Sequence, residues 1–166
     1  MTNRNLGHTK DGSDAYDEAI SNGHLTAEEK RNLERTKAWS DAYGDLDNIE
    51  RFCDMYADST EIYTPLQDWY WAKQGHSNEA WRNGEIEVAK LTGSRKEKIV
   101  SILARGNTVA VQVAIDMSSK DGKHSRQGCF AAFLKFDEDG KIVSDHSFLG
   151  RQPPPSPDQA PTPELK

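Results

Sequence analysis

The sequence has few cysteines, no long apolar run and no concentration of positive charge. Cysteine occurs only as Cys53 and Cys129 in 166 residues, which indicates two buried reduced thiols rather than a disulfide framework. The five histidines are scattered without H-x-x-x-H spacing, and there is no C-x-x-C pair, so we expect no metal. The mean hydropathy of −0.84 leaves no segment apolar enough to cross a membrane.

The charge balance also excludes some partners. The net charge is −6 and no basic stripe follows any expected element, so nucleic acid and anionic membranes are poor partners. Residues 1–14 contain no apolar stretch typical of a signal peptide. A cytoplasmic protein is therefore the default expectation.

Three helices are expected in the first part of the chain. Thr26 and Glu29 form a capping-box pair at the start of the first helix, which Gly44 should end. Apolar residues at helical spacing predict a second helix directly afterwards, with a short extended run closed by Pro65. The expected helices cover residues 25–44, 45–58 and 78–91.

The hydrophobic period changes to two after residue 96. Residues 96–106, 107–119, 123–139 and 140–150 alternate as four strands. Turns are marked by Gly106-Asn107, Asp121-Gly122 and Asp139-Gly140. Because no helix separates these strands, they predict antiparallel hairpins, and helices followed by a meander indicate an α+β fold.

The ends of the chain differ in composition from its centre. Residues 1–24 are polar and are expected to form an arm, with one short helical possibility at 14–20. Residues 151–166 hold six of the seven prolines and are expected to be a disordered or polyproline-like tail. The folded domain should therefore span 25–150.

Two segments carry a resemblance to a known family. GDLDNIERFCDMYADSTEIYTP is similar to the helix–strand unit of ketosteroid isomerases, and DGKIVSDHSFL resembles the last strand of SnoaL-type cyclases and limonene epoxide hydrolases. The chain thus resembles the nuclear transport factor 2-like superfamily over residues 25–150. This resemblance implies a curved antiparallel sheet and helices that enclose a conical, mostly apolar cavity without a cofactor.

The resemblance also implies which residues face that cavity. Strand alternation places Asp145 and Ser147 inside on the last strand, and Phe130 inside on the strand before it. The isomerases' own catalytic groups are missing, because Thr64, Ala132 and Trp39 stand where they have a base, an oxyanion-binding acid and a tyrosine. Steroid-type isomerisation by that set is therefore not expected.

Asp145, His146 and Tyr63 are the catalytic candidates. A carboxylate that points into an apolar cavity has a raised pKa and can serve as a general base. A histidine side chain can act as an acid or a base at neutral pH, although alternation directs His146 away from Asp145 unless a bulge intervenes. Tyr63 lies beside the position of the relatives' base and could donate to a substrate oxygen. Each residue could instead have a purely structural role. Asp145 could be a solvated carboxylate at the end of a strand, His146 could lie in a subunit contact, and Tyr63 could pack in the core.

Other residues are candidates for substrate binding. Aromatic rings suit a flat aromatic ligand, although they could equally fill a shallow core or a subunit interface. Arg126 could reach an anionic or phenolic oxygen, and so could Arg105. The full set expected to bind substrate is Trp39, Tyr43, Thr64, Trp69, Trp71, Trp81, Lys90, Arg126, Phe130 and Ser147.

The preferred hypothesis is a cofactor-independent lyase that acts on a bulky hydroxylated aromatic molecule. The most specific form resembles the diarylpropane lyases of lignin catabolism, which release formaldehyde and water to give stilbenes. Two alternatives stay open: a dehydratase, isomerase or polyketide cyclase of the same fold, and a non-catalytic ligand-binding protein.

A homo-oligomer, dimer or trimer, is expected from the apolar residues of the sheet. Val109, Val111, Val113 and Ile115 share one side of a strand and are assigned to the outer face, together with Cys129, Ala131 and Phe133. Apolar residues on an outer face indicate a partner on the convex side of the sheet.

Overall fold

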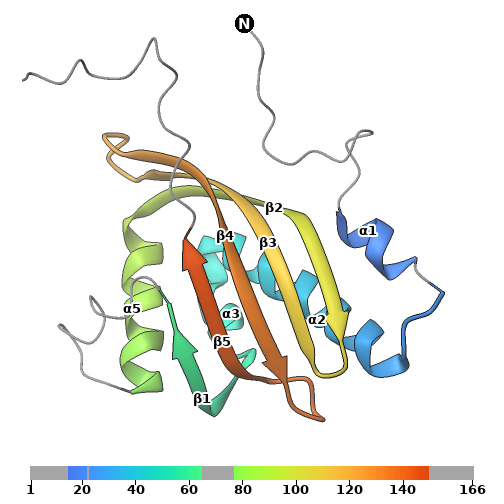
Figure 1. Ribbon diagram of the computed structural model, residues 1–166. Helices are drawn as coiled ribbons and strands as arrows, with labels where there is room; N and C mark the ends of the chain where they lie inside the picture. The colour runs from blue at the N-terminus through green and yellow to red at the C-terminus, as the bar shows by residue number, and fades with distance from the viewer. Residues whose placement is uncertain (1–14, 22, 65–76, 150–166) are drawn as a thin grey trace, which may run out of the picture.

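The computed structural model describes residues 15–21, 23–64 and 77–149. Its elements build a curved sheet with helices on one face, so the α+β expectation is confirmed. Figure 1 shows α2 and α3 behind the sheet and α5 along its β1 edge. The elements are α1 (Ala15–Ile20), α2 (Ala27–Gly44), the 3-10 turn η1 (Leu46–Asn48), α3 (Ile49–Cys53), β1 (Tyr56–Tyr63), α5 (Asn78–Leu91), β2 (Thr92–Arg105), β3 (Thr108–Ser119), β4 (Ser125–Phe136) and β5 (Ile142–Leu149).

The five strands lie in the order β1-β5-β4-β3-β2. Strands β2 to β5 form the expected antiparallel meander. The sheet is mixed, however, because β1 pairs in parallel with β5, and this corrects the expectation of a wholly antiparallel sheet. The meander returns the last strand to the edge where the first one lies, and there the two run in the same direction.

Local sequence signals account for most element boundaries. The hydroxyl of Thr26 accepts from the backbone N–H of Glu29, whose carboxylate accepts from the backbone N–H of Thr26, so the capping box begins α2 as expected. Helix α5 has the bounds predicted for it. The three turn glycines Gly106, Gly122 and Gly140 have φ of 56°, 69° and 77°, which L side chains rarely adopt.

The second helix is shorter than the sequence predicted. It ends at Cys53, and the chain is already extended at Tyr56. The helical spacing of Phe52, Cys53 and Tyr56 is coincidental, because Tyr56 opens β1 and pairs with Ile142 of β5.

The valine-rich face of β3 is buried in the core, and its assignment to the outer face is wrong. Val109, Val111 and Val113 are at most 3% exposed and lie opposite Leu134, Ala132 and Phe130 of β4. They face the helices because the concave side is the covered side. On β4 the outer assignment holds: Phe133 is an exposed aromatic residue.

The remaining composition-based expectations concern helices and cysteines. Among the described residues, no helix combines the length and apolar character needed to cross a membrane. Both cysteines are free, Cys53 fully buried and Cys129 partly buried. Burial raises the pKa of the Cys53 thiol to about 12, which favours an inert core thiol.

Within the segment expected to be an arm, α1 packs against the core through Tyr16 and Ile20.

Candidate active site

Asp145 is buried at the centre of the structure, where the sheet meets the helices. It lies on β5 opposite Leu134 of β4 and beside Ile62 of β1. Its exposed fraction is 2%. Alternation along β5 places Asp145 and Ser147 on the concave face and His146 on the outer face, as expected from the sequence.

Both carboxylate oxygens of Asp145 accept hydrogen bonds from side chains. The hydroxyl of Tyr56 donates to Oδ2 at 2.7 Å, and the hydroxyl of Ser147 donates to Oδ1 at 2.6 Å. The indole N–H of Trp39 in turn donates to the Tyr56 hydroxyl at 2.8 Å. The chain Trp39–Tyr56–Asp145 therefore fixes the orientation of the carboxyl group.

The surroundings of Asp145 alter its acidity. Burial raises the pKa of the Asp145 carboxyl, and the bonds from Ser147 and Tyr56 and the charge of His146 offset only part of this. The pKa of the Tyr56 hydroxyl is also raised, mainly by burial and then by the neighbouring carboxylate. Tyr56 therefore remains a hydrogen-bond donor, whereas Asp145 can exchange a proton closer to neutral pH than an exposed aspartate can.

Asp145 lines a cavity of about 430 Å³. Its walls are mainly apolar and aromatic, as expected of a site for a small organic molecule. Phe52 and Tyr56 stand in T-shaped contact at 5.4 Å between ring centroids, and Trp81 lies 4.4 Å from Tyr56. The cavity lies between α2, α3 and α5 on one side and β3, β4 and β5 on the other.

Helix α5 contributes two polar groups to this cavity, from Trp81 and Glu85. Both residues are 5% exposed, and they lie one helical turn apart. Within the described part of the chain, the buried indole N–H of Trp81 has no hydrogen-bond partner. A buried donor without a partner is uncommon, and a ligand oxygen would satisfy it. Glu85 places a second carboxyl group in the cavity wall.

Most of the residues singled out from the sequence meet at this cavity. Trp39, Tyr43 and Trp81 come from the helices, and Phe130 comes from the sheet. The predicted site residues that line the cavity are Trp39, Tyr43, Thr64, Trp81, Arg126, Phe130, Asp145 and Ser147.

Three predicted site residues lie elsewhere. The expected places of Tyr63 and Lys90 in the cavity are corrected, whereas His146 lies outside it as alternation along β5 predicted. Tyr63 is 53% exposed on the outer face, where its ring lies 6.1 Å from that of His146. His146 lies on the same face, with Nε2 3.4 Å from Oε1 of Glu61. No bulge reverses the alternation of β5 at these positions. Lys90 is exposed on α5. Trp69 and Trp71 lie outside the described residues.

Two residues of the site were missed by sequence reasoning. Tyr56 was assigned to the apolar face of a helix, although period-two spacing with Thr60 and Ile62 also fits the strand that forms. Glu85 could have been found, because a glutamate at helical spacing from Trp81 and Val88 falls on the buried face of α5.

The donor atoms of the site do not suggest a metal centre. Over the described ranges, no group of three or more His, Cys, Asp or Glu side chains has an arrangement that could hold a metal ion. The contacts of Asp145 are with hydroxyl groups, which orient a carboxylate for proton transfer rather than complete a ligand set.

Comparison with solved structures identifies the fold. One similar structure is SalBIII, an epoxide hydrolase/cyclase-like enzyme with a role in pyran ring formation in the polyether salinomycin. It superposes with a TM-score of 0.61 at 17% sequence identity, and the match covers 76% of this chain and 95% of SalBIII. An NTF2-like protein from Exiguobacterium gives a TM-score of 0.54 at 17% identity over 73% of this chain and 99% of its own. The chain has the nuclear transport factor 2-like fold.

A second enzyme among these neighbours is an M. tuberculosis LEH-like epoxide hydrolase. It superposes with a TM-score of 0.58 at 13% sequence identity, and the match covers 74% of this chain and 85% of that one. No family model and no curated protein matches the sequence. Neighbours of this fold therefore include enzymes of the epoxide hydrolase and cyclase-like kind.

Proposed function

We propose that the protein is a cofactor-independent lyase that acts on a bulky, hydroxylated aromatic molecule bound in the cavity. The observation that carries this proposal is the buried carboxyl group of Asp145, held by Tyr56 and Ser147 at the base of a mostly apolar cavity. An acid–base group with a raised pKa in a site that excludes water is suited to removing a proton from a neutral molecule.

The roles of the side chains follow from their positions. Asp145 is the general base, and Tyr56 keeps its carboxyl group oriented toward the cavity. The N–H of Trp81 donates to the substrate oxygen on which negative charge develops. Glu85, on the helix side of the same cavity, is the acid that protonates the leaving group.

The most specific form of this reaction is deformylation of a lignin-derived diarylpropane diol. Asp145 takes the proton of the primary alcohol, and its oxygen–carbon bond becomes the carbonyl of formaldehyde. The carbon–carbon bond to the rest of the molecule breaks, and its electron pair forms the double bond of a stilbene. The benzylic hydroxyl leaves and takes a proton from Glu85 as water. Every group required is a side chain of the cavity, so the reaction needs no cofactor.

A second candidate is addition of an oxygen nucleophile to an epoxide, as hydrolysis or cyclisation. The similarity in fold to an LEH-like epoxide hydrolase and to SalBIII favours it. The same two carboxyl groups would then act as base for the nucleophile and acid for the epoxide oxygen. Dehydration or isomerisation by this pair is a variant of the lyase chemistry, and a ligand-binding protein without catalysis is the remaining alternative.

The experiment is a substrate screen with two matched variants. Hydroxylated aromatic dimers are incubated with the protein, and formaldehyde and stilbene fluorescence are followed; epoxides are assayed in parallel. Asp145→Asn should lower kcat by about 100-fold or more, as expected for loss of a general base. The control, Asp116→Asn, changes an aspartate whose carboxylate accepts from Gln127 on the outer face, and it should retain full activity.

Two results would contradict the proposal. Full activity of the Asp145→Asn protein would remove Asp145 from the reaction. Turnover of epoxides or polyketide ketones, with none of the aromatic diols, would replace the lyase by one of the alternatives.

A further inference from the structure

We propose that Arg126 is an anion-binding subsite that holds a carboxylate at the end of the substrate farthest from Asp145. This inference rests on the proposed function, because it specifies the charge and the length of the aromatic substrate proposed there. The substrate class is then an elongated aromatic carboxylate rather than a neutral aromatic compound.

The position of Arg126 on β4 directs its side chain toward the cavity. It lies opposite Met117 of β3, and both residues line the cavity wall. Gly128, two residues further along the same face, leaves open space where a side chain would stand. The guanidinium group of Arg126 can therefore reach along the wall toward Phe130 without a clash.

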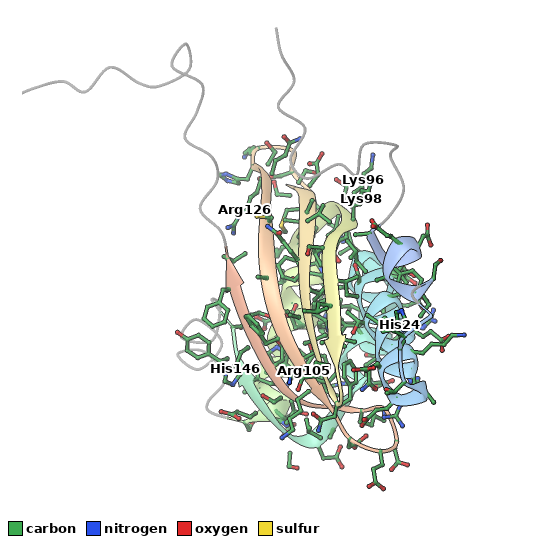
Figure 2. All side chains as sticks on the ribbon, turned by 45° about the vertical axis from the view of Figure 1, so that its right-hand side comes forward. His24, Lys96, Lys98, Arg105, Arg126 and His146 are labelled. Carbon is green, nitrogen blue, oxygen red and sulfur yellow. The ribbon has the colours of Figure 1, made fainter. Side chains whose placement is uncertain are left out.

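This end of the cavity is its polar entrance. Ser118, Ser119, His124 and Ser125 of the β3–β4 hairpin line it, and the last two are exposed to solvent. Figure 2 shows Arg126 near this end of the sheet, with Arg105 and His146 near the other. A ligand can thus bury its apolar body and keep a charged group at the entrance.

The charge of Arg126 is not neutralised by the acidic residues near it in the sequence. Within the described ranges, Arg126 is the only arginine or lysine of the cavity wall, and no described carboxylate forms an ion pair with it. Asp116 accepts from Gln127 on the outer face. Asp121 accepts from the hydroxyl of Ser119 and the backbone N–H of Lys123. The planar guanidinium group therefore keeps its donors for a ligand carboxylate.

Arg95 shows how this sheet holds an arginine that serves the structure. It lies opposite Met117 from the other side, on β2, so the two arginines occupy the same row of the concave face. Its guanidinium group is 3.8 Å from the ring centre of Tyr43 and donates to the backbone oxygen of that residue at 2.8 Å. Arg95 is thereby fixed against α2, whereas Arg126 is not fixed in this way.

The separation of the two ends along β4 indicates a long ligand. Asp145 pairs with Leu134, and Arg126 precedes Leu134 by eight residues on β4. Eight residues of strand span about 26 Å, from which the two side chains and the curvature of the sheet must be subtracted. Because a single aromatic ring is much shorter than this separation, a ligand that touches both Asp145 and Arg126 needs at least two linked rings.

The test is binding of a matched pair of probes, trans-stilbene-4-carboxylate and trans-stilbene-4-carboxamide. The two have nearly the same size and shape and differ in charge. Binding is measured by calorimetry and by quenching of tryptophan fluorescence, since Trp39 and Trp81 line the cavity. It is measured in the wild type and in Asp145→Asn, so that the result does not depend on turnover.

The carboxylate should bind at least about tenfold more tightly than the carboxamide, as expected for a charge-assisted hydrogen bond. Arg126→Gln should abolish this preference and leave carboxamide affinity unchanged, and Arg126→Lys should keep part of it. Arg105→Gln removes the same charge from the other end of the sheet and should change neither affinity. Added salt should weaken carboxylate binding alone.

Equal affinities of the two probes for the wild type would overturn the inference, as would a preference that survives in Arg126→Gln. The proposed function fails by a different result, full activity of Asp145→Asn, which leaves the probe affinities unaffected. The two proposals can thus be rejected independently.

Discussion

The hydroxyl of Tyr56 donates to Asp145 Oδ2 at 2.7 Å, across 89 positions of the sequence. The two residues belong to β1 and β5, which are parallel neighbours in the sheet. Because the Tyr56 hydroxyl also accepts from the indole of Trp39, its one proton is directed to the carboxylate. The acidity of the candidate catalytic group therefore depends on a residue that is distant in the sequence but adjacent in the fold.

Tyr56→Phe should shift the pH dependence of activity upward. The bond from Tyr56 lowers the pKa of Asp145, so its removal raises that pKa further, and the acidic limb of the kcat/KM profile moves to higher pH. Loss of the partner of the Trp39 N–H should also cost about 1–3 kcal/mol of stability.

The control for this variant is Tyr43→Phe. Tyr43 lines the same cavity, but its hydroxyl is not bonded to Asp145, so the acidic limb should stay in place. An unshifted profile for Tyr56→Phe would mean that Asp145 does not set that limb.

Trp81→Phe should lower kcat/KM by about tenfold or more while the fold is retained, because a hydrogen bond to a developing oxyanion is lost. No hydrogen bond of the free protein is removed, since the Trp81 N–H has no partner among the described residues. Trp39→Phe is the contrasting variant, because it breaks the bond to Tyr56 and should lower the melting temperature as well. Unchanged kcat/KM for Trp81→Phe would show that its N–H does not meet the substrate.

Glu97→Gln should stabilise the protein at alkaline pH. Burial against α2 raises the pKa of the Glu97 carboxyl from 4.5 to about 8, against the opposing effects of the Ser40 hydroxyl and Arg95. A raised pKa gives stability that is full below about pH 4.5 and is lost as the pH rises through about 8. Glutamine does not ionise, so the variant should exceed the wild type by up to about 5 kcal/mol at alkaline pH, and the difference should shrink in acid.

The measurement is chemical denaturation at several pH values. Ser40→Ala removes the bond that lowers the pKa of Glu97, and it should move the loss of stability to still higher pH. A difference between Glu97→Gln and the wild type that is the same at every pH would contradict the assignment.

A second copy of the chain is expected on the outer face of the sheet. Phe133, Phe148 and Tyr63 are 51%, 47% and 53% exposed there. The ring of Phe148 contacts both of the others, with centroids 6.3 Å from Phe133 and 5.8 Å from Tyr63. Light scattering after size exclusion should show an oligomer for the wild type and a monomer for Phe133→Glu. Ala27→Glu, at an exposed position of α2 on the other side of the sheet, should leave the oligomer intact. A monomeric wild type would contradict the expectation.

Local patterns in the sequence determined much of this protein. The capping box at Thr26 and Glu29, the bounds of α5 and the glycine turns depend on neighbouring residues, so they could be predicted without the rest of the chain. Alternation likewise put Asp145 and His146 on opposite faces of β5, because successive side chains of a strand point to opposite sides.

Only the tertiary structure decided which face of the sheet is covered and what meets Asp145. Alternation groups Val109 with Val113 but does not say that the helices cover their side. The spacing around Tyr56 fits a helix and a strand equally, and pairing with the distant β5 selects the strand. The bond from Ser147, two residues away on β5, is local. The burial of Asp145 and its bond from Tyr56 follow from contacts between segments far apart in the sequence, which a local pattern cannot encode.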